Sequence, residues 1–129
     1  ISAEGVTAAK DYPGTGYDLV TFFDCLHDMT HPADVIAATG ARLEGADLVI
    51  ICTPVGACGA VAQAIAPHLA PGAILSDVGS VKGAVVAAVA PYVPAGVHFI
   101  PAHPIAGTEF SGPDAGFATL FQNRWCVLT

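Results

Sequence analysis

Between residues 46 and 128 the chain alternates short apolar runs with segments of helical periodicity, and this alternation limits the fold more than any other feature. The run Ala46–Thr53 is apolar nearly throughout, as expected for a strand that is buried on both faces of a parallel sheet. In the next segment, Val61, Ile65 and Leu69 recur every four residues and mark one face of a helix. Strands that alternate with helices in this way are typical of βαβ units.

The same alternation extends over most of the chain. We expect five strands, at 18–25, 46–53, 73–77, 98–103 and 124–128, and a sixth short edge strand near 6–9. Helices are expected at 30–38, on the face marked by Val61, on the face marked by Val85, and briefly at 115–121. Pro67 and Pro71-Gly72 should end the second helix, and Pro91 and Pro94 the third. The predicted fold is α/β: one Rossmann-like doubly wound domain over 1–129, with five or six mostly parallel strands and helices on both faces.

Composition narrows the possible partners. The 129 residues are 53% hydrophobic, which excludes intrinsic disorder and allows one sizeable core. No apolar run approaches the ~20 residues of a membrane span, and residues 1–10 do not resemble a signal peptide. With four Lys and Arg against eleven Asp and Glu, nucleic acid is not an expected partner. Helices rich in alanine and valine leave few charges for their outer faces, so a homodimer is a fair expectation.

The four cysteines show no metal-binding or disulfide spacing. Cys25, Cys52 and Cys126 lie in apolar, strand-like runs, where a free cysteine acts as a small hydrophobic residue; Cys58 is the fourth. We interpret them as reduced core residues, which suits a cytoplasmic protein.

A possible metal motif near the start of the chain is incomplete. His27 and His31 are four residues apart, as in the helical zinc motif, but Asp28 stands where that motif has glutamate. Pro32 follows at once, so the stretch reads as solvated loop residues, and no metal site is predicted.

Polar residues follow three of the expected strands where each strand ends. Thr53, Ser80 and His103 lie at or just beyond these ends, and Glu109 follows shortly after. In open α/β sheets, ligands bind beyond the carboxyl ends of the strands. Neighbouring strands are ~4.8 Å apart, so these side chains are expected to share one crevice.

Each of these residues also has a structural interpretation. Thr53 is at a position that can simply end a strand, and Ser80 can cap the helix expected near Val81. His103 taken alone reads as a hydrogen-bonded structural histidine, and Glu109 as a solvated loop charge. Function is inferred because all four fall at one edge of the sheet. A histidine at that edge, with a reference pKa of about 6.5, can serve as a base near neutral pH.

Several blocks of sequence resemble one enzyme family. Ala46-Asp-Leu-Val-Ile-Ile-Cys-Thr-Pro-Val-Gly56, Asp77-Val-Gly-Ser-Val-Lys-Gly83 and His103-Pro-Ile-Ala-Gly-Thr-Glu109 are similar to the prephenate/arogenate dehydrogenases, in that family's order and near its spacing. The resemblance covers 45–129 and also includes Leu120-Phe121 before the last strand.

The resemblance implies an oxidative decarboxylation of tyrosine biosynthesis, in which NAD or NADP takes hydride from a small-molecule substrate that becomes aromatic. It implies that His103 deprotonates the substrate hydroxyl, that Ser80 hydrogen-bonds nearby, and that Glu109 shapes the substrate side. The cofactor would be bordered by residues of two loops, namely Thr53, Pro54, Val55, Gly79 and Ser80.

The match departs from the family pattern at both ends. Gly14-Thr-Gly16 lacks the third glycine of the dinucleotide fingerprint and precedes a strand, whereas the fingerprint follows one. The family's second, helical domain is not matched either. We therefore expect an incomplete domain with weak cofactor binding and little or no turnover alone.

The start of the chain resembles a different family. Residues Ala9–Met29 look like the central strand region of class I S-adenosylmethionine-dependent methyltransferases, again without the glycine loop. This favours a chimera of a methyltransferase-like segment (1–31) and a dehydrogenase-like segment (45–129). The alternatives are a natural divergent fragment, an artificial Rossmann-like protein without enzymatic activity and, with least support, a methyltransferase fragment.

Overall fold

The computed structural model describes residue 40 and residues 43–107 and 116–129. These residues form two α-helices, α2 (Cys58–Ile65) and α3 (Lys82–Val89), and five strands: β1 (Leu48–Ile51), β2 (Ile74–Asp77), β3 (His98–Ile100), β4 (Ala102–Pro104) and β5 (Cys126–Leu128). The strands expected at 6–9 and 18–25 and the helix expected at 30–38 lie outside the described residues. No helix in the described part is long and apolar enough to cross a membrane.

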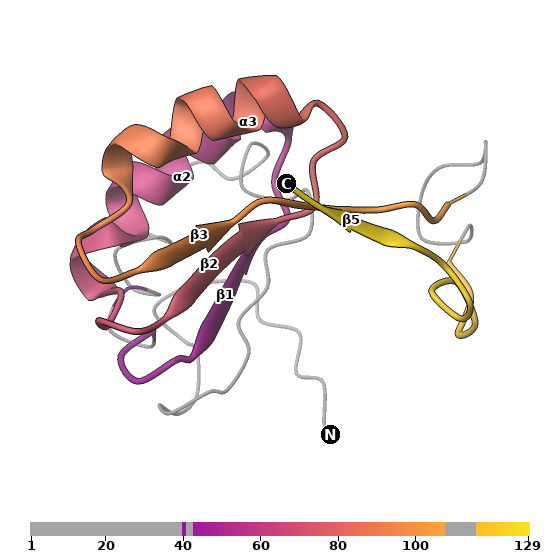
Figure 1. The fold of residues 1–129 in the computed structure, drawn as a ribbon, viewed down its shortest axis with the longest axis horizontal. Helices are drawn as coiled ribbons and strands as arrows, with labels where there is room; N and C mark the ends of the chain where they lie inside the picture. The colour runs from indigo at the N-terminus through magenta and orange to yellow at the C-terminus, as the bar shows by residue number, and fades with distance from the viewer. Residues whose placement is uncertain (1–39, 41–42, 108–115) are drawn as a thin grey trace, which may run out of the picture.

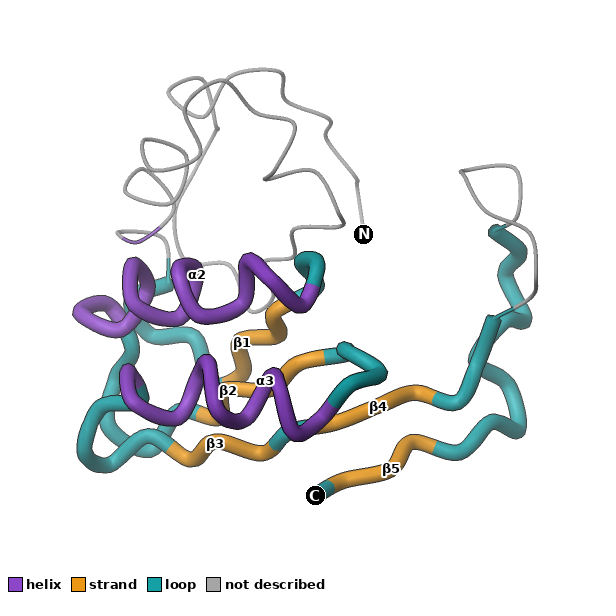
Figure 2. The backbone as a smooth tube through the Cα atoms, turned by 90° about the horizontal axis from the view of Figure 1, so that it is seen from above, coloured by secondary structure: helices purple, strands orange, loops and turns teal. Residues whose placement is uncertain are grey.

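Strands β1, β2 and β3 form a parallel sheet in chain order, with Ile51 opposite Asp77 and Ser76 opposite Ile100. Helix α2 connects β1 to β2, and α3 connects β2 to β3. Both helices cover the same face of the sheet and lie side by side (Figures 1 and 2). Successive crossovers of one hand, running in one direction along a sheet, place their helices on one face. The helix predicted at 30–38 lies outside the described residues.

The core lies between the two helices and the sheet. Leu75, Val85 and Val89 are fully buried there, and Gly59 of α2 lies against Ala88 of α3. A Cβ atom at Gly59 would stand 3.1 Å from the Ala88 carbonyl oxygen, so the missing side chain lets the two helices approach closely. Small residues at this contact thus allow dense packing between the two helices.

Prolines end both helices, at the first of the two stops that the sequence predicts for each. Helix α2 ends at Ile65 and α3 at Val89, and each continues into a single 3-10 turn that contains Pro67 or Pro91. Proline has no backbone N–H to donate to the carbonyl four residues earlier, and its ring crowds that carbonyl. The helix therefore cannot extend past this point.

The prediction of one continuous strand at 98–103 is wrong. Pro101 divides it into β3, which belongs to the parallel sheet, and β4, which pairs with β5 in a separate antiparallel ribbon. Proline cannot donate a ladder hydrogen bond, and the next amide, that of Ala102, donates to the Asp77 side chain instead. The chain therefore leaves the parallel sheet, and β4 and β5 extend away from it as an arm (Figure 1).

The short helix predicted at 115–121 is also wrong in its described part. Residues 118–123 form successive turns, closed by the bonds Leu120 N–Phe117 O and Gln122 N–Thr119 O. Asn123 has a positive φ of 56°, a conformation that asparagine tolerates better than most residues and that leads the chain into β5.

Large exposed apolar side chains gather in the arm and its turns. Six of them lie between residues 105 and 128, namely Ile105, Phe117, Phe121, Trp125, Val127 and Leu128, whereas α2 and α3 themselves contribute none. The expected homodimer was inferred from apolar outer faces of the helices. The described residues place the exposed apolar surface elsewhere, and dimerisation stays a prediction.

A matched pair of leucines tests this core. Leu75→Ala removes a side chain with 0% exposure, and we expect it to lower the free energy of unfolding by about 2–5 kcal/mol through lost burial and a residual cavity. Leu128→Ala changes a side chain with 64% exposure, and we expect a change within about 0.5 kcal/mol. Urea unfolding followed by circular dichroism measures both; equal losses would contradict the described core.

Candidate active site at the carboxyl edge of the sheet

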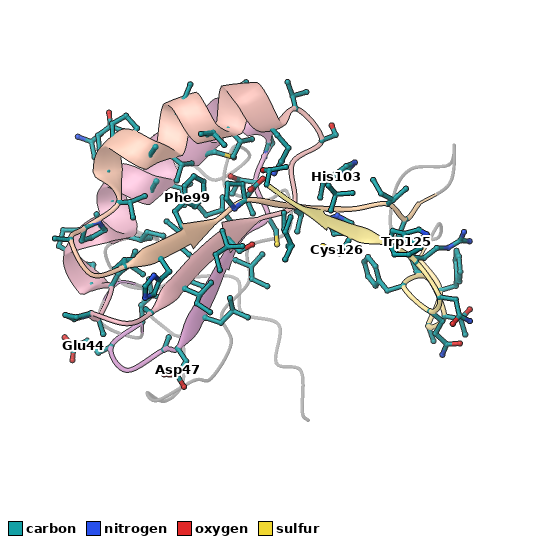
Figure 3. The ribbon with its side chains drawn as sticks, viewed as in Figure 1. Glu44, Asp47, Phe99, His103, Trp125 and Cys126 are labelled. Atoms are coloured by element: carbon teal, nitrogen blue, oxygen red, sulfur yellow. The ribbon has the colours of Figure 1, made fainter. Side chains whose placement is uncertain are left out.

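The loops that follow β1 and β2 lie at one end of the parallel sheet, and His103 lies at the same end. The strand arrows point toward His103, whereas Glu44 and Asp47 lie at the opposite, amino end (Figure 3). The structure therefore brings the described candidate residues to the edge where parallel sheets hold ligands. Glu109, predicted beside them, lies outside the described residues.

The loop after β1 carries Thr53, Pro54 and Val55. Thr53 is only 8% exposed, and its hydroxyl lies 3.8 Å from the Cys58 sulfur at the start of α2. Its side chain is thus engaged in the interior rather than directed at the open edge. Pro54 is exposed, and Val55 begins the 3-10 turn that leads into α2. This loop therefore offers its backbone and Pro54, rather than the threonine hydroxyl, to the edge.

The loop after β2 packs tightly around Gly79. A Cβ atom there would lie 3.0 Å from Val85 Cγ2, 3.1 Å from Asp77 Oδ2 and 3.5 Å from Val55 Cγ2. Only glycine fits this position without displacing a neighbour. Because Val55 is one of those neighbours, the loops after β1 and β2 are in contact and form one continuous surface.

Ser80 is exposed on this surface and does not cap a helix. Helix α3 begins at Lys82, its N-cap is Val81, and no side chain makes a capping hydrogen bond. The interpretation of Ser80 as an N-cap is therefore wrong. Its hydroxyl remains at the open edge.

A buried ion pair ties the elements of the edge together, and no sequence motif had indicated it. Asp77 has 0% exposure and pairs with the ammonium of Lys82. The same carboxylate accepts hydrogen bonds from Gly79 N at 2.7 Å and from Ala102 N at 3.3 Å. Lys82 Nζ also donates to the Ala102 carbonyl at 2.7 Å. The buried carboxylate and its ammonium partner are thus both hydrogen-bonded, as a buried charge requires.

The sequence did contain a signal for this pair. Asp77 is the one charged residue of strand β2, and Lys82 follows five residues later, in the first turn of the next helix. A charged residue within a buried strand is rarely left without a partner. That rule points to a nearby cation, and Lys82 is the one Lys or Arg between Arg42 and Arg124.

His103 is half-buried in β4, and its ring contacts the loop after β2. The Nδ1 atom lies 3.4 Å from the carbonyl oxygen of Val78. A carbonyl can only accept, so the neutral ring makes a hydrogen bond here only in its Nδ1–H form. The Nε2 atom then carries the free lone pair, and the imidazole is prepared to accept a proton there.

The interior thiols do not supply a nucleophile to this edge. Burial raises the pKa of the Cys52 thiol, and the Asp77 carboxylate adds to the effect. Burial also raises the pKa of Cys58, against a smaller lowering by its hydrogen bond with Thr53. Both thiols are free and stay protonated near neutral pH. Cys126, by contrast, is exposed, so its interpretation as a core residue is wrong.

Within the described ranges, no group of three His, Cys, Asp or Glu side chains is placed to hold a metal ion. His27, Asp28 and His31, whose spacing had suggested a metal motif without completing one, lie outside those ranges.

Comparison with known proteins identifies the family. Residues 30–129 match the family model described as prephenate dehydrogenase, nucleotide-binding domain. The chain belongs to this family. The match starts fifteen residues before the segment that the sequence motifs had indicated, so it includes the region of Thr30–Glu44.

Relatives of the prephenate dehydrogenase family agree in sequence and structure. A cyclohexadienyl dehydrogenase of Zymomonas mobilis is 50% identical over 84 residues, which are 65% of this chain and 28% of that protein. The crystal structure of prephenate dehydrogenase from Aquifex aeolicus superposes with a TM-score of 0.61 at 31% identity, over 73% of this chain and 32% of that one. Synechocystis arogenate dehydrogenase gives 0.58 at 33% identity, over 73% and 31%.

These superpositions confirm the Rossmann-like α/β fold of the prephenate dehydrogenase domain. The chain spans under a third of the length of these relatives. What the described residues establish is therefore the nucleotide-binding part of the family's architecture.

Thiol reactivity tests the described burial of the cysteines. We expect iodoacetamide at neutral pH to label Cys126 well before Cys58, because Cys126 is exposed whereas Cys58 is 1% exposed with a raised pKa. Peptide mapping by mass spectrometry assigns the labelled residue, and the same reaction in denaturant is the control in which the two should label alike. Equal labelling in the folded protein would contradict the described interior.

Proposed function

We propose that this chain is the cofactor-binding and base-carrying part of an NAD(P)-dependent dehydrogenase that acts on prephenate or arogenate. One observation carries the proposal: in a domain of this family, the His103 ring stands at the carboxyl edge with Nδ1 directed at the Val78 carbonyl, 3.4 Å away. That contact leaves Nε2 as the proton acceptor, which is what oxidation of a hydroxyl requires.

The two loops of the edge fit a nicotinamide cofactor. A Cβ atom at Gly56 would meet nothing within 4 Å, and Pro54 and Ser80 are exposed. The surface beside the packed Gly79 is thus open and bordered by backbone, which suits the close approach of a flat ring and its ribose. One relative, the prephenate dehydrogenase of Aquifex aeolicus, has been crystallised in complex with hydroxyphenyl propionate and NAD+. We propose NAD as the first cofactor to test and NADP as the second.

In the proposed reaction, a bound nicotinamide cofactor supplies the hydride acceptor. His103 Nε2 takes the proton of the substrate hydroxyl as hydride leaves the carbon that bears this hydroxyl. The carbon–carboxylate bond then breaks, its electron pair completes the aromatic ring, and carbon dioxide departs. The Ser80 hydroxyl hydrogen-bonds near this hydroxyl, and Glu109 shapes the substrate side. The ring oxygen is left as a phenolate when the ring becomes aromatic, and His103 returns its proton to that oxygen.

We further propose that the chain alone binds the cofactor weakly and turns over little substrate. It spans under a third of its relatives, and catalysis depends on holding a substrate at both ends. The methyltransferase-like origin of residues 1–31 stays part of the proposal, since the family match begins at residue 30 and leaves nearly all of that segment outside it. So does a cytoplasmic location, which agrees with the free thiols of Cys52 and Cys58.

Two histidines of the described part give a matched test of binding. We expect NAD+ at millimolar concentration to shift the NMR signals of Val55, Ser80 and His103, because these residues border the open edge. The signals of His98 should not shift, because His98 begins β3 at the amino end of the sheet. Ser80→Ala should weaken the binding by about 0.5–1.5 kcal/mol, the net contribution of one hydrogen bond.

Turnover supplies the second arm of this test. If prephenate or arogenate is oxidised at a measurable rate, His103→Asn should lower kcat by about 10²–10⁴-fold, the usual contribution of a general base, while His98→Asn leaves it unchanged. Absence of shifts with both NAD+ and NADP+ would favour a Rossmann-like protein without enzymatic activity. Shifts with S-adenosylmethionine alone would favour the methyltransferase alternative.

A further inference from the structure

We propose that Asp77 and Lys82 are positioning residues for His103, acting as a buried clamp that fixes the imidazole in its Nδ1–H form before any ligand binds. The proposal rests on the proposed function for its catalytic meaning, but its geometry is independent of substrate and cofactor. We call the two residues, with their bonds to Gly79 and Ala102, the Asp77–Lys82 clamp.

One side of the clamp holds the loop after β2. Asp77 Oδ2 accepts the amide of Gly79 at 2.7 Å, and the amide of Val78 donates to Ile51 O at 3.3 Å. Val78 is therefore fixed from both sides, through its own amide and through that of its neighbour. The direction of its carbonyl follows from these two bonds.

The other side of the clamp holds β4. The Ala102 amide donates to Asp77 Oδ1 at 3.3 Å, and the Ala102 carbonyl accepts from Lys82 Nζ at 2.7 Å. Both peptide groups around Ala102 are thus engaged, and His103 is the next residue. The backbone from which the imidazole extends is held by the same two side chains that hold the loop facing it.

The two sides meet at the contact between His103 Nδ1 and the Val78 carbonyl. This contact is 3.4 Å long and solvent-exposed, so the hydrogen bond alone is too weak to hold the ring against water. The clamp is charged and paired around a fully buried carboxylate, which makes it the stiffer part. It joins β2, the start of α3 and β4, and it sets the distance across which the exposed contact forms.

The ring tautomer reports this role directly. In the unliganded protein, ¹⁵N-labelled histidine NMR should show His103 mainly in the Nδ1–H form. Lys82→Met keeps the length of the side chain but removes the ammonium, and we expect it to lose this preference and give the tautomer mixture of a solvated imidazole. Asp77→Asn should do the same. Lys82→Arg keeps the cation and should restore the Nδ1–H form at least in part.

Controls separate positioning from loss of fold. Arg124→Met removes an exposed cation outside the clamp, and His98 is an internal reference whose signals should not change in any variant. If Lys82→Met fails to fold because Asp77 is left unpaired, the double variant Asp77→Asn/Lys82→Met leaves no buried charge and should fold with the tautomer preference lost. A folded Lys82→Met or double variant that keeps the Nδ1–H form would overturn the proposal.

The outcome is distinguishable from that of the proposed function. The tautomer is measured without cofactor or substrate, so a lack of turnover would not contradict the proposed role of the clamp. The converse result is that cofactor binding shifts the NMR signals of Val55 and Ser80 while Lys82→Met leaves the tautomer unchanged. That result would support the proposed dehydrogenase function and reject the proposed role of the clamp.

Discussion

A carboxylate with no solvent exposure organises the carboxyl edge of this sheet. Asp77 ends β2 inside the protein, where an unpaired charge would be strongly unfavourable. Its partners come from three places, namely the loop at Gly79, the first turn of α3 at Lys82 and the backbone of Ala102. Satisfying one buried charge therefore fixes where a loop, a helix and a strand stand relative to one another. The candidate site is built on these three elements.

Much of the fold was predictable because local signals and the fold agree. The apolar run at 46–53 predicts a parallel strand that the structure describes as β1, and the prolines after α2 and α3 end those helices as expected. The break at Pro101 was not predicted, because His98–His103 reads as one apolar run. A long-range interaction accounts for the break. The Ala102 amide, which follows Pro101, donates a hydrogen bond to Asp77, 25 residues away in sequence. The turns at 118–123 likewise replaced a helix that composition alone suggested.

For the candidate site too, some features follow from local sequence and topology, and others depend on long-range packing. Topology alone predicts that Thr53, Ser80 and His103 reach one edge, since parallel strands end there together. The direction of each hydroxyl depends on packing, which sequence does not state. Thr53 turns toward Cys58, and Ser80 leaves the helix start uncapped. The pairing of Asp77 with Lys82 was not predicted, because a charged side chain is usually solvated. Only the position of Asp77 at the end of a short strand that begins Ile74-Leu75 indicates burial.

The position of the base on β4, rather than on a free loop, gives the site a specific property under the proposed function. A histidine on a mobile loop would adopt its working tautomer only when substrate arrived, and part of the binding energy would be spent in ordering it. Here Val78 and Ala102 are held through one carboxylate, so the imidazole meets a carbonyl that is already in place. Preorganisation of this kind favours the transition state, because the ordering cost falls on folding and not on catalysis. It also explains why a costly buried charge would be kept at the end of β2, where an apolar residue would complete the core but leave loop and strand unconnected.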